Sequence, residues 1–276
     1  MPVAPLLPRS AVSQILIQNI ETSLEPCLHA SGKISLRLDN PVHDRILLPS
    51  FHITNFLPSG RTLSDRSDVT THIQQVPVHD ITAAILAGGR GARLGGVDKG
   101  LEELSGQPLV AHIIAALKPQ CGTLLINANR NQPRYADFGY PVVADDSGEF
   151  LGPLAGMLSV LRAAQTHYVL CVPCDAPLLP ADLTARLWQA LVQNQAQASV
   201  ARSVDGLQPV YALLDRSLAD RLHAFLNSGA RKTADWLRAM AAAEADFSDC
   251  PSMFLNMNTT ADRAMLLRTL QEASPC

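Results

Sequence analysis

The stretch "ITAAILAGGRGARLGGVDKG", residues 81–100, places an apolar run directly before a loop rich in glycine and positive charge. The run 81–87 consists of small, β-branched and aliphatic residues, which is typical of a buried strand. The loop 86–100 holds six glycines, two arginines and one lysine. Exposed backbone amides in such a loop bind anions, and basic side chains add charge-assisted contacts. We therefore predict a site for several phosphate groups, such as a nucleoside triphosphate. The alternative is a glycine-rich turn with solvated basic residues.

Two familiar phosphate-binding loops do not fit this stretch. A Walker A loop needs Ser or Thr after its lysine, but Gly100 follows Lys99. The dinucleotide fingerprint G-x-G-x-x-G is nearly matched by Gly89, Gly91 and Gly95, yet the second gap is one residue too long. No acidic residue ends the second predicted strand, where a dinucleotide-binding protein would hold the ribose. The sequence therefore gives no support for hydride chemistry on a nicotinamide cofactor.

From residue 80 onward, short apolar runs alternate with segments of helical periodicity. Strands joined through helices pair in parallel with right-handed crossovers. We therefore predict an α/β fold with a doubly wound, mostly parallel, Rossmann-like sheet, whose ligand binds at the carboxyl ends of the strands. The predicted strands are 81–87, 123–128, 141–144 and 167–172, the further short apolar segments are 198–203, 208–214 and 253–256, and the predicted helices are 108–117, 153–164, 180–194, 218–227, 233–243 and one from 261.

Residues 1–79 differ in composition from the rest of the chain. They hold eight of the nineteen prolines but only two of the sixteen glycines. The segments 33–40 and 44–56 could each form a short strand, but no long periodic helix is present to build a core. We predict that 1–79 is a poorly structured extension and that 80–276 is the main domain. The extension is either dispensable or an over-called reading frame whose true start lies near Val76 or Val78.

Composition and charge argue against several classes of function. The formal net charge is −3, and no basic face suited to a nucleic acid stands out. No apolar run approaches the roughly 18 to 20 residues that a membrane-spanning helix needs. The six cysteines are widely scattered, which favours a reducing cytoplasm over a disulfide scaffold. The pair Cys171 and Cys174 lacks a second cysteine pair, so we expect apolar packing there and not a zinc site.

Six segments, taken in order, resemble the molybdenum cofactor guanylyltransferase family of nucleotidyltransferases. Two positions depart from the family pattern: Leu94 stands where methionine is usual, and Thr260 stands where proline is usual. The resemblance covers about residues 80–270, and 1–79 has no counterpart in it. The matching segments are the loop 86–99, "INANRN" at 126–131, "GPLAG" at 152–156, "PCDAP" at 173–177, "QPVYAL" at 208–213 and "NMNT" at 256–259.

The resemblance implies that GMP is transferred from GTP to molybdopterin and that pyrophosphate is released. It assigns Arg93 and Lys99 to the phosphates and Asp175 to Mg²⁺, which makes these three the expected catalytic residues. Asp175 follows the predicted strand 167–172, where a carboxylate can hold a metal ion against a triphosphate. The alternatives are surface cations for Arg93 and Lys99, and a turn cap for Asp175.

The resemblance also divides the main domain into a nucleotide half, about 80–180, and a pterin-acceptor half, about 181–276. Asn127 could instead cap a strand end, and Asp145 could be an Asx-turn residue; Asp145 keeps the family register better than its neighbour Asp146. The nucleotide-contacting groups implied are the backbone of Leu86, Ala87, Gly88 and Gly89 and the side chains of Lys99, Asn127, Asp145 and Asp175.

In the acceptor half, the resemblance points to "QPVYAL", Asn256 and Asn258 as pterin contacts. Amide side chains suit a ligand rich in ring nitrogens and carbonyl groups. Both asparagines could equally cap turns. Since Thr260 replaces the usual proline, the geometry of this loop is left open.

The expected partners follow from the same resemblance. GTP and molybdopterin are the substrates, Mg²⁺ is the cofactor, and molybdenum-insertion proteins and molybdoenzyme chaperones are the protein partners. We expect a cytoplasmic monomer that binds neither nucleic acid nor membrane. The alternatives are a molybdopterin cytidylyltransferase, another nucleotidyltransferase that joins an NTP to a phosphate, and a nucleotide-binding subunit without turnover.

Overall fold

The structure is a computed structural model that describes residues 26–28, 34–36, 76–89, 98–146 and 152–272. The chain divides into two compact units, Met1–Thr70 and Thr71–Cys276. In the first unit the described residues form two short strands, β1 (Pro26–Leu28) and β2 (Ile34–Leu36), which pair antiparallel. The predicted strand within 44–56 lies outside the described residues.

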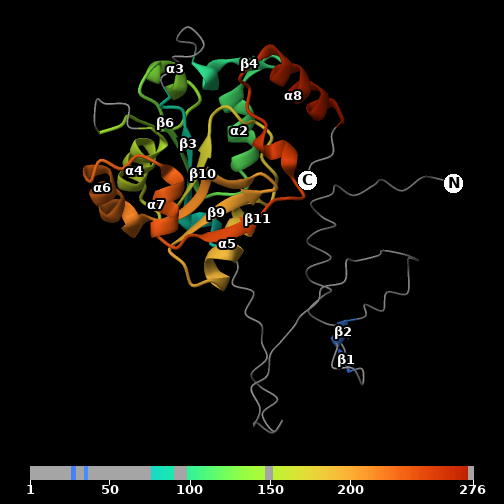
Figure 1. Cartoon of the computed structure of the whole chain (residues 1–276). Helices are drawn as coiled ribbons and strands as arrows, with labels where there is room; N and C mark the ends of the chain where they lie inside the picture. The colour runs from blue at the N-terminus through green and yellow to red at the C-terminus, as the bar shows by residue number, and fades with distance from the viewer. Residues whose placement is uncertain (1–25, 29–33, 37–75, 90–97, 147–151, 273–276) are drawn as a thin grey trace, which may run out of the picture. The chain divides into compact units, whose positions relative to one another are not determined.

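The second unit is built on a mostly parallel sheet, as predicted. Its seven strands lie in the order β11-β9-β10-β8-β3-β6-β7 (Figure 1). Strand β3 lies inside the sheet and pairs in parallel with both β6 and β8. The strands are β3 (Ile81–Leu86), β6 (Thr123–Asn127), β7 (Val142–Val143), β8 (Tyr168–Pro173), β9 (Ala198–Ser203), β10 (Gly206–Asp215) and β11 (Ala243–Asp246).

Strand β10 departs from the predicted parallel pairing. It runs antiparallel to both of its neighbours, β8 and β9. The cause is local: Ser203 pairs with Gly206, so two residues connect β9 to β10 in a hairpin, and no crossover helix fits there. The register between these strands shifts between Gln208 and Ala212. The hairpin brings the amino-terminal part of β10 to the sheet edge where β8 ends.

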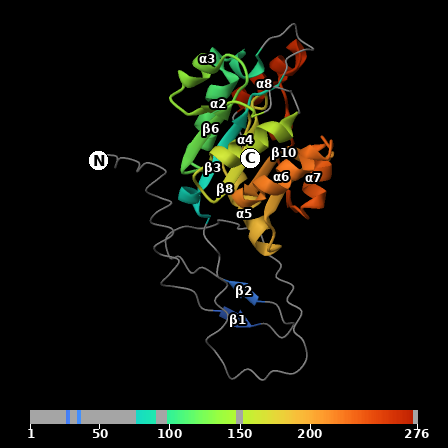
Figure 2. The ribbon, with the colours of Figure 1, turned by 90° about the vertical axis from the view of Figure 1, so that its left-hand side faces the viewer.

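Helices cover both faces of the sheet, which confirms the doubly wound class (Figures 1 and 2). One apolar cluster joins the sheet to α2 and α5, and a second joins it to α4, α6 and α7. Strand residues alternate between them: Ala83 and Ile85 lie in the first cluster and Ala84 in the second. The helices are α2 (Leu109–Leu117), α3 (Gln132–Ala136), α4 (Pro153–Ala163), α5 (Leu183–Gln193), α6 (Ala219–Asn227), α7 (Thr233–Ala239) and α8 (Thr260–Glu272).

Several small elements were not predicted. Helix α7 ends at Ala239, four residues earlier than expected, because Ala241 adopts a left-handed φ of 51°. The chain then forms the unpredicted strand β11, which buries Ala243 and Ala245 alternately. The other unpredicted elements are α3, the hairpin of β4 (Glu103–Leu104) and β5 (Gln107–Pro108), and short 3₁₀ turns at 78–80, 99–101, 216–218 and 251–254.

The last helix, α8, packs on its own small apolar cluster. Its Leu266 is fully buried together with Leu104, Leu109 and Met257. This contact attaches α8 to the β4–β5 hairpin and to the start of α2. Among the described residues, no helix is both long and apolar enough to span a membrane.

Candidate active site

The carboxyl ends of four neighbouring strands define one edge of the sheet. In the pairing register, Leu86 at the end of β3 lies opposite Asn127 of β6 on one side and Pro173 of β8 on the other. Ligands of doubly wound folds bind at this edge. The predicted site residues that the structure describes gather in two groups on either side of the end of β3.

The first group surrounds the backbone that follows β3. The N–H of Ala87 donates to the carbonyl of Asn127 at 2.8 Å, which continues the pairing beyond the strand. A Cβ atom at Gly88 would lie 3.0 Å from side-chain atoms of both Asn127 and Asn129. A Cβ atom at Gly89 would meet nothing within 4 Å. Gly88 therefore allows close packing against β6, while Gly89 leaves open space above the sheet edge.

Asp145 lies at the centre of this first group. Its Oδ1 accepts a hydrogen bond from Asn127 Nδ2 at 2.9 Å, and its Oδ2 accepts one from Asn129 Nδ2 at 2.8 Å. The N–H of Asp145 donates in turn to Asn129 Oδ1 at 2.8 Å. Asp146 instead forms an ion pair with Arg162 at 2.5 Å on the surface. Of the two neighbouring aspartates, Asp145 is therefore the one held at the sheet edge.

Asn129 was not singled out as a site residue by sequence reasoning. Besides holding Asp145, its Nδ2 donates to the carbonyl of Gly88 at 3.3 Å. Asn129 thus links the residues after β7 to the backbone after β3. Asn127, only 1% exposed, makes a similar link: its side chain donates to Val143 and Asp145, and its carbonyl accepts from Ala87. The signal was present in "INANRN", where three asparagines alternate from the strand end onward.

The second group combines residues far apart in the sequence. Lys99 Nζ lies 2.9 Å from Asp175 Oδ2 and also donates a hydrogen bond to Asn258 Oδ1. Both charged side chains are largely shielded, with 27% of Lys99 and 16% of Asp175 exposed. A cation and a carboxylate thus meet in a partly dry position at the carboxyl end of β8.

The loop that carries Asn256 and Asn258 is tied to Asp175. The N–H of Met257 donates to the carbonyl of Asp175 at 2.8 Å. The N–H of Asn258 donates to Asp262 Oδ2 at 3.0 Å, within the first turn of α8. The loop is therefore held on one side by the residue that follows β8 and on the other side by the last helix.

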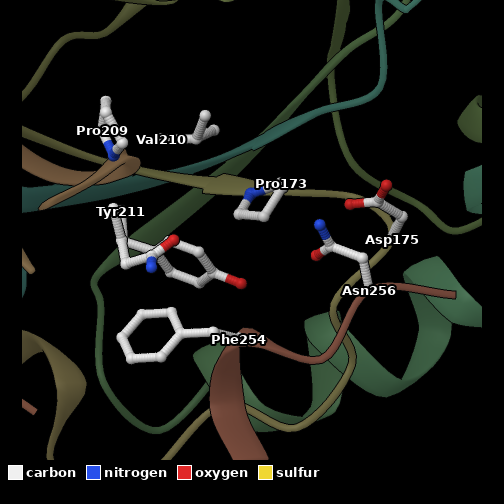
Figure 3. Close-up of a pocket in the computed structure, with 8 residues that line it drawn as sticks. Pro173, Asp175, Pro209, Val210, Tyr211, Phe254 and Asn256 are labelled. Carbon is white, nitrogen blue, oxygen red and sulfur yellow. The ribbon is translucent and has the colours of Figure 1, made fainter. Parts of the chain in front are cut away.

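A hollow of about 250 Å³ opens beside Asp175 (Figure 3). Asn256 lies with Asp175 at one end, and the rings of Tyr211 and Phe254 meet edge to face, with centroids 5.2 Å apart, at the other. The hydroxyl of Tyr211 donates to the carbonyl of Met253 at 3.1 Å, so it fixes the wall of the hollow. None of the lining residues is basic; they are Pro173, Asp175, Gln208, Pro209, Val210, Tyr211, Phe254 and Asn256.

The oxygen donors at this edge suit a metal ion that is shared with a substrate. Among the described residues, no group of three or more His, Cys, Asp or Glu side chains forms a complete metal site. Mg²⁺ usually takes one or two carboxylates and completes its shell with substrate phosphates and water. Asp175, beside the amide oxygen of Asn258, fits that pattern. The described residues therefore fit a Mg²⁺ ion shared with a substrate better than one enclosed by protein ligands alone.

Cys171 and Cys174 are both free thiols. Burial raises the pKa of Cys171 to about 12. Burial, together with the charge of Asp175, also raises the pKa of Cys174 well above its usual range. Cys171 packs in the second apolar cluster and Cys174 packs against the first, so both thiols serve as small apolar side chains.

One segment of the predicted site lies outside the described residues. Arg93, Leu94, Gly91 and Gly95 fall within residues 90–97, outside the described part of the chain. The residue before this segment, Gly89, lies at the sheet edge, and the residue after it, Asp98, directly precedes Lys99.

Comparison with known proteins agrees with this arrangement. Residues 83–244 match the family model described as the MobA-like NTP transferase domain. The chain belongs to this family. The matched range runs from the third residue of β3 to the second residue of β11 and includes Lys99, Asn127, Asp145 and Asp175.

Curated members of the family match about two thirds of the chain. The chain is 49% identical over 186 residues to a molybdenum cofactor guanylyltransferase of Shewanella sediminis, covering 67% of this chain and 95% of that protein. It is 48% identical over 188 residues to a protein of the same name from Shewanella putrefaciens, covering 68% of this chain and 96% of that protein.

Solved structures share the fold at low sequence identity. The molybdopterin-guanine dinucleotide biosynthesis protein A of Archaeoglobus fulgidus has a TM-score of 0.57 and 20% identity, covering 70% of this chain and all of that chain (100%). The 2-C-methyl-D-erythritol 4-phosphate cytidylyltransferase of Thermus thermophilus has a TM-score of 0.52 and 14% identity, covering 68% of this chain and 98% of that chain. The fold is therefore shared by enzymes named for different acceptors and bases.

Proposed function

We propose that this protein transfers GMP from GTP to molybdopterin, forming the guanine dinucleotide form of the molybdenum cofactor and releasing pyrophosphate. The observation that carries the proposal is the meeting of Lys99, Asp175 and Asn258 beside a hollow at the carboxyl edge of the sheet. The family membership and the shared name of the curated relatives supply the substrates.

The triphosphate would bind where the loop after β3 meets Lys99. Gly88 and Gly89 offer backbone without side chains, and Lys99 offers an ammonium group. Nucleotidyl transfer depends mainly on positioning and on neutralising charge. Lys99 would stabilise the charge that moves onto the pyrophosphate as it leaves, and Arg93 would assist it.

Asp175 would hold Mg²⁺ against the phosphates, together with oxygens of the nucleotide. When bound, this ion neutralises phosphate charge and aligns the attacking and leaving oxygens. The ammonium of Lys99 is the countercharge to Asp175, at 2.9 Å. This pairing holds the carboxylate at the edge of the sheet.

The guanine base would bind beside Asp145 and the backbone of Leu86 to Gly88. Guanine presents N–H donors on the edge that carries its N2 amino group, and a carboxylate accepts such donors. Asn127 and Asn129 each occupy one lone pair of the Asp145 carboxylate. The second lone pair of each oxygen is the group that a guanine would meet.

The pterin would enter the hollow between Asp175 and the two aromatic rings. Its lining combines apolar and aromatic side chains with the amides of Gln208 and Asn256. Gln208 is held by a hydrogen bond from its Nε2 to Ser203 Oγ at 2.9 Å, which leaves its carbonyl oxygen to accept from a ligand. Because no lining residue is basic, the phosphate of the acceptor would point out of the hollow toward Lys99.

The reaction would then be an in-line displacement at the α-phosphorus of GTP. An oxygen of the molybdopterin phosphate forms the new bond, and the bond to the pyrophosphate oxygen breaks. The two binding groups flank the end of β3, so nucleotide and acceptor approach each other across Leu86. We place this reaction in the cytoplasm, carried out by a monomer that exchanges molybdopterin and product with molybdenum-insertion proteins and molybdoenzyme chaperones.

A nucleotide competition assay with molybdopterin supplied tests the proposal. Pyrophosphate release is measured with GTP in the presence of excess CTP, UTP or ATP. We expect GTP alone to support turnover; a preference for CTP would assign the protein as a cytidylyltransferase. Nucleotide binding without pyrophosphate release would indicate a non-catalytic subunit.

Asp175→Asn tests the role of the carboxylate separately. The substitution keeps the shape of the side chain and removes its charge, so we expect turnover to fall by about 100-fold or more while folding is retained. Retention of full Mg²⁺-dependent activity, with circular dichroism unchanged, would exclude the metal assignment.

A further inference from the structure

The residue before Lys99 is held through both of its side-chain oxygens. Tyr135 Oη donates to Asp98 Oδ1 at 2.5 Å, and Asn131 Nδ2 donates to Asp98 Oδ2 at 2.9 Å. Tyr135 lies in the short helix α3, and Asn131 is its N-cap. A single two-point contact therefore joins α3 to the start of the turn that carries Lys99.

Tyr135 is firmly anchored in the core, although helix α3 has only five residues. Its side chain is 0% exposed and belongs to the larger apolar cluster. Burial raises the pKa of Tyr135 far above its usual range, and the nearby Cys174 and Asp98 act in the same direction. The hydroxyl therefore stays protonated and donates to the Asp98 carboxylate.

Gly100 provides the space that this hydroxyl needs. A Cβ atom at position 100 would lie 2.5 Å from Tyr135 Oη and 3.3 Å from Cys174 Cβ. The backbone of Gly100 is not in the left-handed region, so the reason for glycine here is space and not conformation. The Tyr135 hydroxyl thus reaches Asp98 by passing through the volume that any side chain at position 100 would fill.

The turn held in this way directs the side chain of Lys99. The N–H of Leu101 donates to the carbonyl of Asp98 at 3.0 Å, and the N–H of Glu102 donates to the carbonyl of Lys99 at 3.0 Å. A lysine side chain is long and flexible, so its ammonium keeps one position only if its backbone is fixed. The contact of Lys99 Nζ with Asp175 depends on that backbone.

We propose that Tyr135 is a positioning residue for Lys99, acting through Asp98, and that Gly100 is required to let its hydroxyl pass. The inference rests on the proposed function in that it takes Lys99 as the phosphate-binding cation. Tyr135 itself touches neither the hollow nor Asp175 in the described contacts. Its effect on the reaction is therefore indirect and is expected in nucleotide binding and turnover.

The test is Tyr135→Phe in the full-length protein, which removes one oxygen and keeps the ring. Acylation of Lys99 by a water-soluble succinimidyl ester, followed by peptide mass spectrometry, reports the position of its ammonium without any turnover. The exposed Lys118 and Lys232 serve as internal references. We expect Lys99 to react faster in the variant, and kcat/KM for GTP to fall by about tenfold, the size of effect that a small displacement of a catalytic group produces.

Tyr168→Phe is the matched control. Tyr168 packs on the same apolar cluster but begins β8, at the opposite end of that strand from the site. It should leave both Lys99 acylation and kcat/KM unchanged. If Tyr135→Phe remains folded and behaves like this control in both measurements, the positioning role is wrong.

Two further variants keep the inference testable if Tyr135→Phe unfolds. Asp98→Asn removes the charge that accepts both hydrogen bonds and should give the same rise in Lys99 acylation. Gly100→Ala should lower the free energy of unfolding less in the Tyr135→Phe background than alone, because the hydroxyl that would clash with the new methyl group is gone. An equal loss of stability in both backgrounds would overturn the steric part.

Absence of pyrophosphate release in the unmodified protein would instead contradict the proposed function. The acylation result would still decide whether Tyr135 positions Lys99.

Discussion

At the scale of single residues, the proposed nucleotide side of the site depends on where Asn127 can place its amide. Asn127 is almost fully buried between the end of β3 and helix α4, and its Nδ2 reaches Asp145 and the carbonyl of Val143. A Cβ atom at Gly156 in α4 would lie 2.4 Å from Asn127 Oδ1. The second glycine of "GPLAG", Gly156, therefore makes room for the amide that holds Asp145.

Gly156→Ala is expected to destabilise the protein, against the usual effect of this change in a helix. Alanine inside a helix is normally favoured over glycine by about 1 kcal/mol. Here the clash with Asn127 should reverse the sign and lower the free energy of unfolding by about 1–3 kcal/mol. The KM for GTP should rise as Asp145 loses its partner. Urea unfolding and steady-state kinetics measure the two effects.

The companion change Asn127→Ala identifies the cause. If the clash with the amide is responsible, Gly156→Ala should lower the free energy of unfolding much less in the Asn127→Ala background. The same cost in both backgrounds would point to another contact of α4.

Cys171 gives a pH dependence whose sign is fixed by its burial. The unfolded thiol titrates near 9.0, whereas burial raises the pKa of Cys171 in the folded protein to about 12. Between these values only the unfolded chain loses the proton. The stabilisation by the neutral thiol is thus complete below pH 9 and is lost as pH rises toward 12, by up to about 1.4 kcal/mol per pH unit.

Two measurements check this prediction. Cys171 should not react with iodoacetamide at pH 8.5 until urea unfolds the protein, and Cys171→Ala should make stability depend less steeply on alkaline pH. Rapid labelling of the folded protein would show that the thiol is accessible and that burial does not set its pKa.

At the scale of elements, α8 brings Asn258 to Lys99 through a capping box. Thr259 Oγ1 accepts from the N–H of Asp262 at 3.1 Å, and Asp262 Oδ2 accepts from the N–H of Thr259 at 2.8 Å. Hydrogen bonds from Thr259 and Asn258 hold the pKa of Asp262 below its ordinary 3.8. The helix therefore starts at Thr260 without the proline that the family pattern has there.

The docking of α8 should be needed for acceptor binding. Leu266→Ala removes a fully buried side chain from the cluster under the helix, and we expect the helix contact to weaken by about 2–4 kcal/mol. Looser docking should raise the KM for molybdopterin more than the KM for GTP, because Asn256 and Asn258 precede α8.

The neighbouring Met265→Ala is the control for this change. Met265 is 51% exposed on the same helix, so its loss should alter stability by no more than about 0.5 kcal/mol. Equal kinetic effects of the two variants would show that α8 does not support the acceptor site.

At the scale of the whole molecule, the family model matches residues 83–244, which lie within the second unit, and the match does not extend into Met1–Thr70. The curated relatives align with about two thirds of the chain, 67% in one case, while 95% of that relative is covered. The described apolar clusters and both site groups lie within Thr71–Cys276.

We therefore expect residues 71–276 alone to fold and to keep the activity. Thermal unfolding and kcat/KM for GTP of the shortened protein should be close to those of the full chain. A large loss of either would assign the first unit a role in stability or substrate handling.

The fold class and most strands could be predicted because their signals are local. Runs such as 81–87 and 167–172 bury both faces, and their apolar composition is visible in the sequence. The direction of β10 could not be predicted in this way, since it depends on the two-residue turn after Ser203. Strand β11 was missed because its four residues continue an alanine-rich helical pattern.

The sequence by itself determined which chemical groups are available: a glycine loop with basic residues after a buried strand, and polar residues after the following strands. Only the tertiary structure decided which of them meet. Lys99 lies 76 residues from Asp175 and 159 from Asn258, and Tyr135 supports the turn of Lys99 from a helix that was not predicted. Such contacts depend on strand order, which places β8 beside β3 and sets α8 over the β4–β5 hairpin. Local propensity carries no information about that order, because the contacts that select it join residues distant in the chain.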